Sequence, residues 1–157
     1  MRKRILSPAS PAEPAPDHDW LDLNLLALVE ISSEDPAHPI ESALSSGVGE
    51  GWRAAGPGEQ TIRILFDAPT RLRHVRLLFE EKEHARTQEF VLRWSADGGR
   101  TLSDVVRQQF NFSPPDGTRE EENYTVELSG VTTLELKIVP QIGGGEAKAS
   151  LRLLRLA

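Results

Sequence analysis

Apolar residues stand at every second position through much of the chain, and the clearest case is the segment 90–94. This period of two predicts a half-buried strand that ends near Trp94. Asp97 and Gly98 follow closely, and an Asp-Gly pair favours a tight hairpin turn because both residues tolerate positive φ. We expect the returning strand to start at Thr101.

The same alternation predicts further strands on both sides of this hairpin. They cover residues 20–31, 61–66, 72–79, 105–112, 124–128, 134–138 and 151–156. The first segment is rich in leucine, so a helix over residues 21–30 is the alternative there. Pro69 is expected to end one strand, and Gly130 to turn the chain between two others. Residues 40–44 are predicted to form one helical turn, and residues 47–58 an irregular glycine-rich loop.

Together these segments make about eight strands at a spacing of roughly ten residues, with no βαβ spacing and no internal repeat. The pattern predicts an all-β fold, an antiparallel β-sandwich. At 157 residues the chain has room for one domain with a hydrophobic core, which we place at residues 20–157. Residues 1–19 contain four prolines among Ala, Ser and Glu, so we predict a flexible, Pro-rich arm.

Charge and composition exclude several classes of partner. The net charge of −6 argues against nonspecific binding to nucleic acid or to an anionic membrane surface. No segment approaches the roughly 18 apolar residues of a membrane helix, so membrane insertion is not expected. Residues 1–4 are basic, but Ser and Pro follow instead of the apolar run of a signal peptide. We therefore expect a soluble, cytoplasmic protein.

No arrangement of residues indicates catalysis. The chain has no cysteine, which excludes disulfides and thiolate chemistry, and its four histidines lack metal-ligand spacing. A nucleophile elbow and a phosphate-binding loop are absent as well. The acidic runs 80–81 and 120–122 are interpreted as solvated faces. We expect a protein that is not an enzyme and that needs no metal or cofactor.

Motifs that follow one another in a fixed order carry a family resemblance. They are residues 32–34 with 38–44, then Trp52, then residues 60–70, 90–99, 134–138 and 149–156. In this order the chain resembles a discoidin-like (coagulation factor type C) domain of the galactose-binding-like jelly rolls, over about residues 24–157. The pair Asp97 and Gly98 then belongs to the Ser-x-Asp-Gly hairpin of that family. The resemblance implies a jelly roll whose binding loops lie at one end of the sandwich.

Two departures from the family pattern concern its structural calcium. The first loop ends without a carboxylate at residues 43–47, and Leu153 stands where the family often has a glutamate. Calcium needs several hard oxygen ligands, so we expect no metal site, although Glu34, Asp35 and Glu50 could compensate.

The resemblance also points to candidate ligand residues, by their position in the binding loops. They are Arg53, His84, Arg86, Gln88, Asn111 and Phe112. Arg86 is the leading candidate, and a salt bridge to Glu81 or Glu83 is its alternative role. Trp52 could stack on a sugar, but it is interpreted as a core residue.

The resemblance thus implies a noncatalytic binding module for carbohydrate or glycoconjugate. The alternative is an intracellular protein–protein interaction or assembly domain without a sugar ligand. A third, weaker hypothesis is a subunit or appended domain of an intracellular enzyme. The oligomeric state stays open.

Overall fold

The computed structural model describes residues 19–45 and 49–157. The Pro-rich arm predicted for residues 1–19 lies outside the described residues except for Asp19, as do the first two residues of the glycine-rich loop predicted for residues 47–58. The elements follow one another as α1 (Leu23–Leu26), β1 (Ala27–Ile31), α2 (Glu41–Leu44), β2 (Trp52–Pro57), β3 (Gln60–Glu80), β4 (Arg86–Ser95), β5 (Ser103–Phe112), β6 (Arg119–Val139), β7 (Lys148–Leu151) and β8 (Leu153–Leu156). No described helix is long and apolar enough to cross a membrane.

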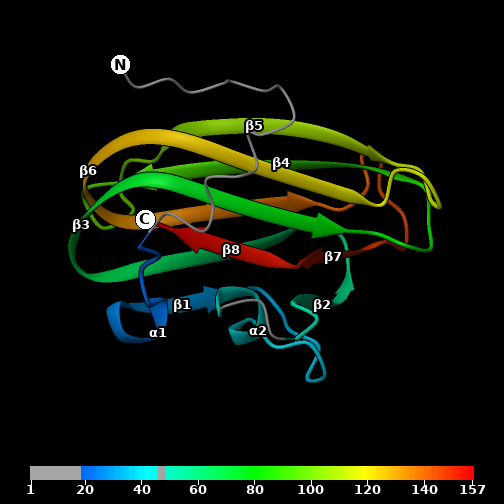
Figure 1. Cartoon of the computed structure of the whole chain (residues 1–157), viewed down its shortest axis with the longest axis horizontal. Coiled ribbons are helices and arrows are strands. Elements are labelled where there is room, and N and C mark those ends of the chain that lie inside the picture. The colour runs from blue at the N-terminus through cyan, green and yellow to red at the C-terminus, as the bar shows by residue number, and fades with distance from the viewer. Residues whose placement is uncertain (1–18, 46–48) are drawn as a thin grey trace, which may run out of the picture.

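Two long strands, β3 and β6, pair with each other over most of their length and belong to both layers of the molecule. Their halves 60–65 and 133–138 lie in a five-stranded layer with the order β1-β3-β6-β4-β5. Their other halves, 74–80 and 119–125, also pair with each other, and β8 pairs with β3 to complete a three-stranded layer. Figure 1 shows both strands curving round one side of the molecule. The antiparallel β-sandwich predicted from the sequence is therefore confirmed.

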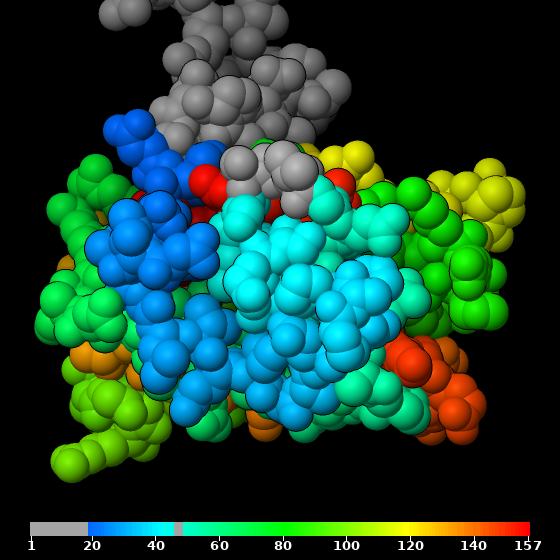
Figure 2. Space-filling model, turned by 90° about the horizontal axis from the view of Figure 1, so that it is seen from below, coloured from blue at the N-terminus to red at the C-terminus, as the bar shows by residue number. Residues whose placement is uncertain are grey.

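The core lies between these two layers, because alternate side chains of each strand point inwards. Phe79 from the three-stranded layer stacks on Phe90 from the five-stranded layer, with ring centroids 5.3 Å apart. Both rings are fully buried, as is Leu92. Trp94 is only partly buried and packs against the edge of the core. The segment from α1 to β2, blue and cyan in Figure 2, covers much of the face drawn there.

Some strand boundaries predicted from the sequence are wrong. Segments 61–66 and 72–79 form the single strand β3, and 124–128 and 134–138 form β6. Pro69 does not end β3, because it lies where the register between β3 and β6 shifts and no ladder hydrogen bond needs its missing N–H. Gly130 adopts φ +67° inside β6, so the strand bends there without ending.

Four other elements also differ from the prediction. The first predicted strand begins as the helix α1, whose backbone N–H at Asn24 donates to Asp22 Oδ1 at 3.1 Å. The hairpin after β4 is wider than a tight turn, because Asp97 Oδ1 accepts from the backbone N–H of Thr101 and β5 begins only at Ser103. The predicted loop before Gly58 contains the strand β2, and the final predicted strand is divided into β7 and β8.

Candidate ligand-binding groove

A two-stranded ribbon, β2 paired with β7, stands beside the two main layers. In its register Arg53 lies opposite Ser150. The alternation of strand side chains divides the ribbon into a buried face, which holds Trp52 and Ala149, and an exposed face. Arg53, Ser150 and Lys148 occupy the exposed face and line a hollow at one end of the sandwich.

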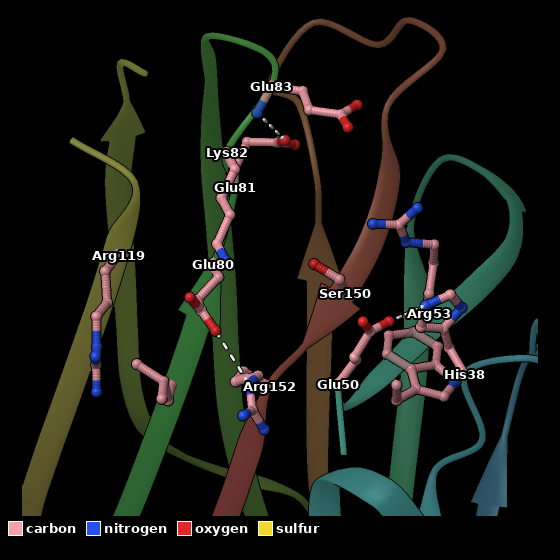
Figure 3. Close-up of a pocket in the computed structure, with 12 residues that line it drawn as sticks. His38, Glu50, Arg53, Glu80, Glu81, Lys82, Glu83, Arg119, Ser150 and Arg152 are labelled. Carbon is pink, nitrogen blue, oxygen red and sulfur yellow. Dashed lines mark hydrogen bonds and ion pairs between the residues drawn. The ribbon is translucent and has the colours of Figure 1, made fainter. Parts of the chain in front are cut away.

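The opposite wall of this hollow is the end of β3 with the loop of residues 81–85. Two adjoining cavities, of about 500 and 390 Å³, share Arg53, Glu80, Glu81, Glu83 and Ser150 as lining residues. We call this double cavity the end groove. Figure 3 shows Arg53 on the ribbon and the acidic residues 80, 81 and 83 across the hollow from it.

Ion pairs fix three places around the end groove. Arg152 Nε lies 3.1 Å from Glu80 Oε1, and His38 Nε2 lies 3.0 Å from Glu50 Oε2 (Figure 3). In the third pair, Arg86 Nε donates to Glu81 Oε1 at 2.8 Å. Burial acts to raise the pKa of Glu81, but its hydrogen bonds from Arg86 and from the loop backbone outweigh that effect and lower it. Glu81 therefore stays ionised and anchors the loop.

Arg86 is held inside the protein. Its side chain is 1% exposed, and besides Glu81 it donates from Nη1 to the carbonyl of Pro140 at 2.8 Å and to Gln88 Oε1 at 3.2 Å. The guanidinium also lies over the ring of Phe112, 4.7 Å from its centroid. The salt bridge to Glu81, which was the alternative role expected for Arg86, is therefore present. All the described hydrogen bonds of Arg86 go to groups of the protein itself.

The six residues predicted from the sequence are not brought together. Arg53 and His84 are exposed and line the second cavity, which Arg86 also borders from within. Gln88 and Phe112 are buried and have no free face for a ligand. The sixth, Asn111, lies on β5 outside both cavities, where its Oδ1 accepts from Thr87.

A buried polar cluster lies between the layers behind this end of the sandwich. Gln88 Nε2 donates to Glu120 Oε1 at 3.2 Å, while Glu120 Oε2 has no hydrogen-bond partner among the described residues. Glu120 is 1% exposed. Burial, aided by the negative charge of Glu122, raises the pKa of Glu120 to about 7, although Gln88 and Arg86 oppose the shift.

Several groove residues were not among the sequence-based candidates. His38 borders the first cavity together with Glu50 and Arg152. The pairing of β2 with β7 brings this group together across a long sequence distance, which no local motif shows. Trp52 is 1% exposed and donates from Nε1 to the carbonyl of Ser33 at 3.1 Å, so its interpretation as a core residue is confirmed.

Two of the three acids that could compensate for the missing calcium ligands accept hydrogen bonds from the backbone instead, and Glu50 pairs with His38. Glu34 Oε1 accepts from the N–H of Ile40 at 2.7 Å, and Asp35 Oδ1 accepts from the N–H of Ala37 at 2.9 Å. Within residues 19–45 and 49–157 no group of three or more metal-binding side chains is found.

Comparison with solved structures shows what the fold is similar to. A family 32 carbohydrate-binding module of C. perfringens NanJ, solved with galactose, has a TM-score of 0.64 at 10% identity and matches 87% of this chain and 96% of its own. The chain has a discoidin-like jelly-roll fold. A pectin-binding carbohydrate-binding module has a TM-score of 0.60 at 16% identity, with 83% of this chain and 89% of its own covered.

A third similar structure is the family 32 module of AlyQ, solved with 4,5-unsaturated mannuronic acid. Its TM-score is 0.54 at 19% identity, and the match covers 89% of this chain and 98% of that module. No protein-family model matches the sequence, and no curated protein is similar to it. The likeness therefore concerns the fold, and the fold predicted from the sequence is confirmed.

Proposed function

We propose that this protein is a noncatalytic carbohydrate-binding module that holds its sugar in the end groove. The observation that carries the proposal is the position of the groove. It lies between the β2–β7 ribbon and the loop of residues 81–85, at one end of a sandwich whose structural neighbours are carbohydrate-binding modules. Loops at the end of a rigid sandwich are a common place for binding residues.

The groups in the end groove match the hydrogen-bonding needs of a sugar. Arg53 and Lys148 are donors for ring and hydroxyl oxygens, Glu83 and Glu146 accept from hydroxyls, and Ser150 can do both. Among the described lining residues no phenylalanine, tyrosine or tryptophan ring is exposed. Affinity therefore rests on directed hydrogen bonds and not on stacking against a sugar face.

The carboxylates support a noncatalytic role. Glu80 and Glu81 are held in ion pairs, and Glu81 has a lowered pKa, which is unsuited to a general acid. Glu120, whose pKa is raised to about 7, is buried in the core and lines neither cavity. The groove thus presents charged groups that bind and orient a ligand, without a matched acid and base.

A glycan array followed by calorimetry tests the proposal. We expect one class of glycan to bind, and Arg53→Ala to weaken that binding while leaving the melting temperature unchanged, because Arg53 is exposed. Arg100→Ala is the matched control, since Arg100 is an exposed arginine in the β4–β5 loop. An array without any signal, or a bound glycan that ignores Arg53→Ala, would count against binding at this groove.

One observation favours a second candidate, a protein-interaction domain. Leu25 and Leu28 are 75% and 61% exposed, and β1 is an edge strand of the five-stranded layer. Light scattering on the purified chain tests this candidate. It predicts a stable oligomer that Leu28→Lys dissociates, whereas a monomer at all concentrations would refute self-association.

A further inference from the structure

Arg53 is a cation without a partner inside the end groove. Most arginines on the described residues lie within ion-pair distance of a carboxylate, but Arg53, Arg100 and Arg155 do not. Arg155 lies over the ring of Trp20, and Arg100 is in the hairpin loop after β4. Arg53 is thus the arginine of this group that lines the end groove, and it borders both of its cavities.

Lys148 provides a second cation on the same wall. It lies two residues from Ser150, the cross-strand partner of Arg53, so the two cations share one face of the ribbon about 7 Å apart along the strand. The backbone N–H of Ala37 and the side chain of His38 lower the pKa of Asp35, and the charge of Lys148 makes the smallest contribution to that shift. Lys148 forms no ion pair with a described residue. Both cations therefore remain available to a ligand.

The opposite wall is rich in carboxylates, and Lys82 on the same loop adds one cation that lines the first cavity. Glu83, on the loop of residues 81–85, is 81% exposed, and its nearest ion-pair partner, the histidine that follows it, is 3.8 Å away. Glu146 lies two residues before β7, borders the second cavity and forms no ion pair with a described residue. A ligand in the groove meets donors on the ribbon, and carboxylate acceptors on the loop of residues 81–85 and just before β7. Carboxylate acceptors suit hydroxyl donors, while two free cations suit an anionic group on the ligand.

We propose, resting on the carbohydrate-binding function above, that the ligand is an acidic sugar, a uronic acid residue within an oligosaccharide. Its carboxylate pairs with Arg53, with Lys148 as the second cation, and its hydroxyls donate to Glu83 and Glu146. A planar carboxylate matches the donor fork of a guanidinium, which favours Arg53 as the primary contact. A neutral sugar would leave the two cations without a counter-charge.

Calorimetry with matched pairs of ligands tests this inference. The probes are trigalacturonate, trimannuronate and triglucuronate, each compared with its carboxyl-reduced, neutral counterpart, which keeps the ring and the linkages. For at least one pair we expect the acid to bind at least tenfold more tightly than the reduced form. Raising NaCl from about 50 to 500 mM should weaken only the acid, because salt screens exposed charges.

Three variants locate the effect in the full chain. Arg53→Gln should weaken binding of the acid at least fivefold and bring it close to that of the reduced form, and Lys148→Gln should have a smaller effect of the same kind. Arg100→Gln, an unpaired arginine outside the groove, should change neither. An unchanged acid affinity in Arg53→Gln, with the fold intact, would overturn the assignment of the carboxylate to this residue.

The outcomes separate this inference from the function on which it rests. Equal binding of acid and reduced forms would refute the acidic class and leave a sugar site in place. Failure of all three acids to bind, with a neutral glycan bound on the array, would do the same. Failure of every uronate together with every array glycan would overturn both proposals.

Discussion

Replacing Glu120 with glutamine should stabilise the protein at neutral and alkaline pH. Glu120 is buried, its Oε1 accepts one hydrogen bond from Gln88, and its Oε2 has no partner among the described residues. An ionised carboxylate in this position loses its hydration without full compensation. The amide keeps the acceptor for Gln88 and has nearly the same volume, but it carries no charge.

The magnitude follows from the pKa of Glu120, which is raised from 4.5 to about 7 mainly by burial. The folded state binds the proton more tightly than the unfolded state, so stability is greatest below pH 4.5 and falls as the pH rises towards 7. At 1.36 kcal/mol per pKa unit, a shift of this size corresponds to a loss of roughly 3 kcal/mol in unfolding free energy. Local relaxation around the charge reduces this loss to about 1.5–3 kcal/mol. Glu120→Gln should remove that loss.

Urea unfolding followed by tryptophan fluorescence provides the assay. We expect the variant to exceed the wild type in unfolding free energy at pH 8 by about 1.5–3 kcal/mol, and the difference to shrink towards zero near pH 4.5. Glu59→Gln is the control, since Glu59 is an exposed carboxylate before β3 and should shift stability by less than about 0.5 kcal/mol at either pH.

Two results would refute this reasoning. A variant that is less stable at both pH values would mean that the Glu120 carboxylate makes a favourable interaction absent from the structure. A stabilisation equal at pH 4.5 and pH 8 would mean that the gain has nothing to do with ionisation. Either result would remove the argument that Glu120 is protonated near neutral pH.

Two further predictions concern the scaffold of the end groove. Arg86→Ala should cost about 3–5 kcal/mol in the same urea assay, because it leaves the largely buried Glu81 without its partner; an effect on ligand affinity with unchanged stability would contradict this structural role. Gly51→Ala should lower the melting temperature, because Gly51 has φ +86° and an added Cβ would collide with the Leu151 carbonyl. Gly58→Ala is the control, since Gly58 has a similar φ of +92° but open space around an added Cβ. The melting temperature should fall less in Gly58→Ala than in Gly51→Ala.

Much of the fold was predictable because the strand pattern is local. The period of two around Trp94 identifies β4 by itself, and tertiary contacts only refine its ends. The pattern failed where a partner distant in sequence decides the structure. β2 is short and ends in Gly56 and Pro57, both poor strand residues, and it is a strand because it pairs with β7. Pro69 caused the opposite error, because it predicted the end of a strand but lies within β3, where the register shifts.

The candidate site was less predictable than the fold. Arg86 was chosen for its place at the start of a strand, but its burial depends on Glu81 and on the carbonyl of Pro140, 54 positions further along the chain. Arg53 lines both cavities of the end groove, and its role as a ligand contact stays a prediction. No local feature of the sequence marks Arg152 as a groove residue. It lies between β7 and β8 and reaches the cavity only when these strands have paired with the rest of the sandwich.

The β2–β7 ribbon has a consequence for the biosynthesis of the protein. Arg53 faces Ser150 across the ribbon, so one wall of the groove consists of residues made early and residues made nearly a hundred positions later. Contacts of such sequence separation form slowly and late in folding. A growing chain on the ribosome can pair β3 with most of β6 while it still lacks this wall. The wall that carries Arg53 is therefore complete only after translation has passed Ser150.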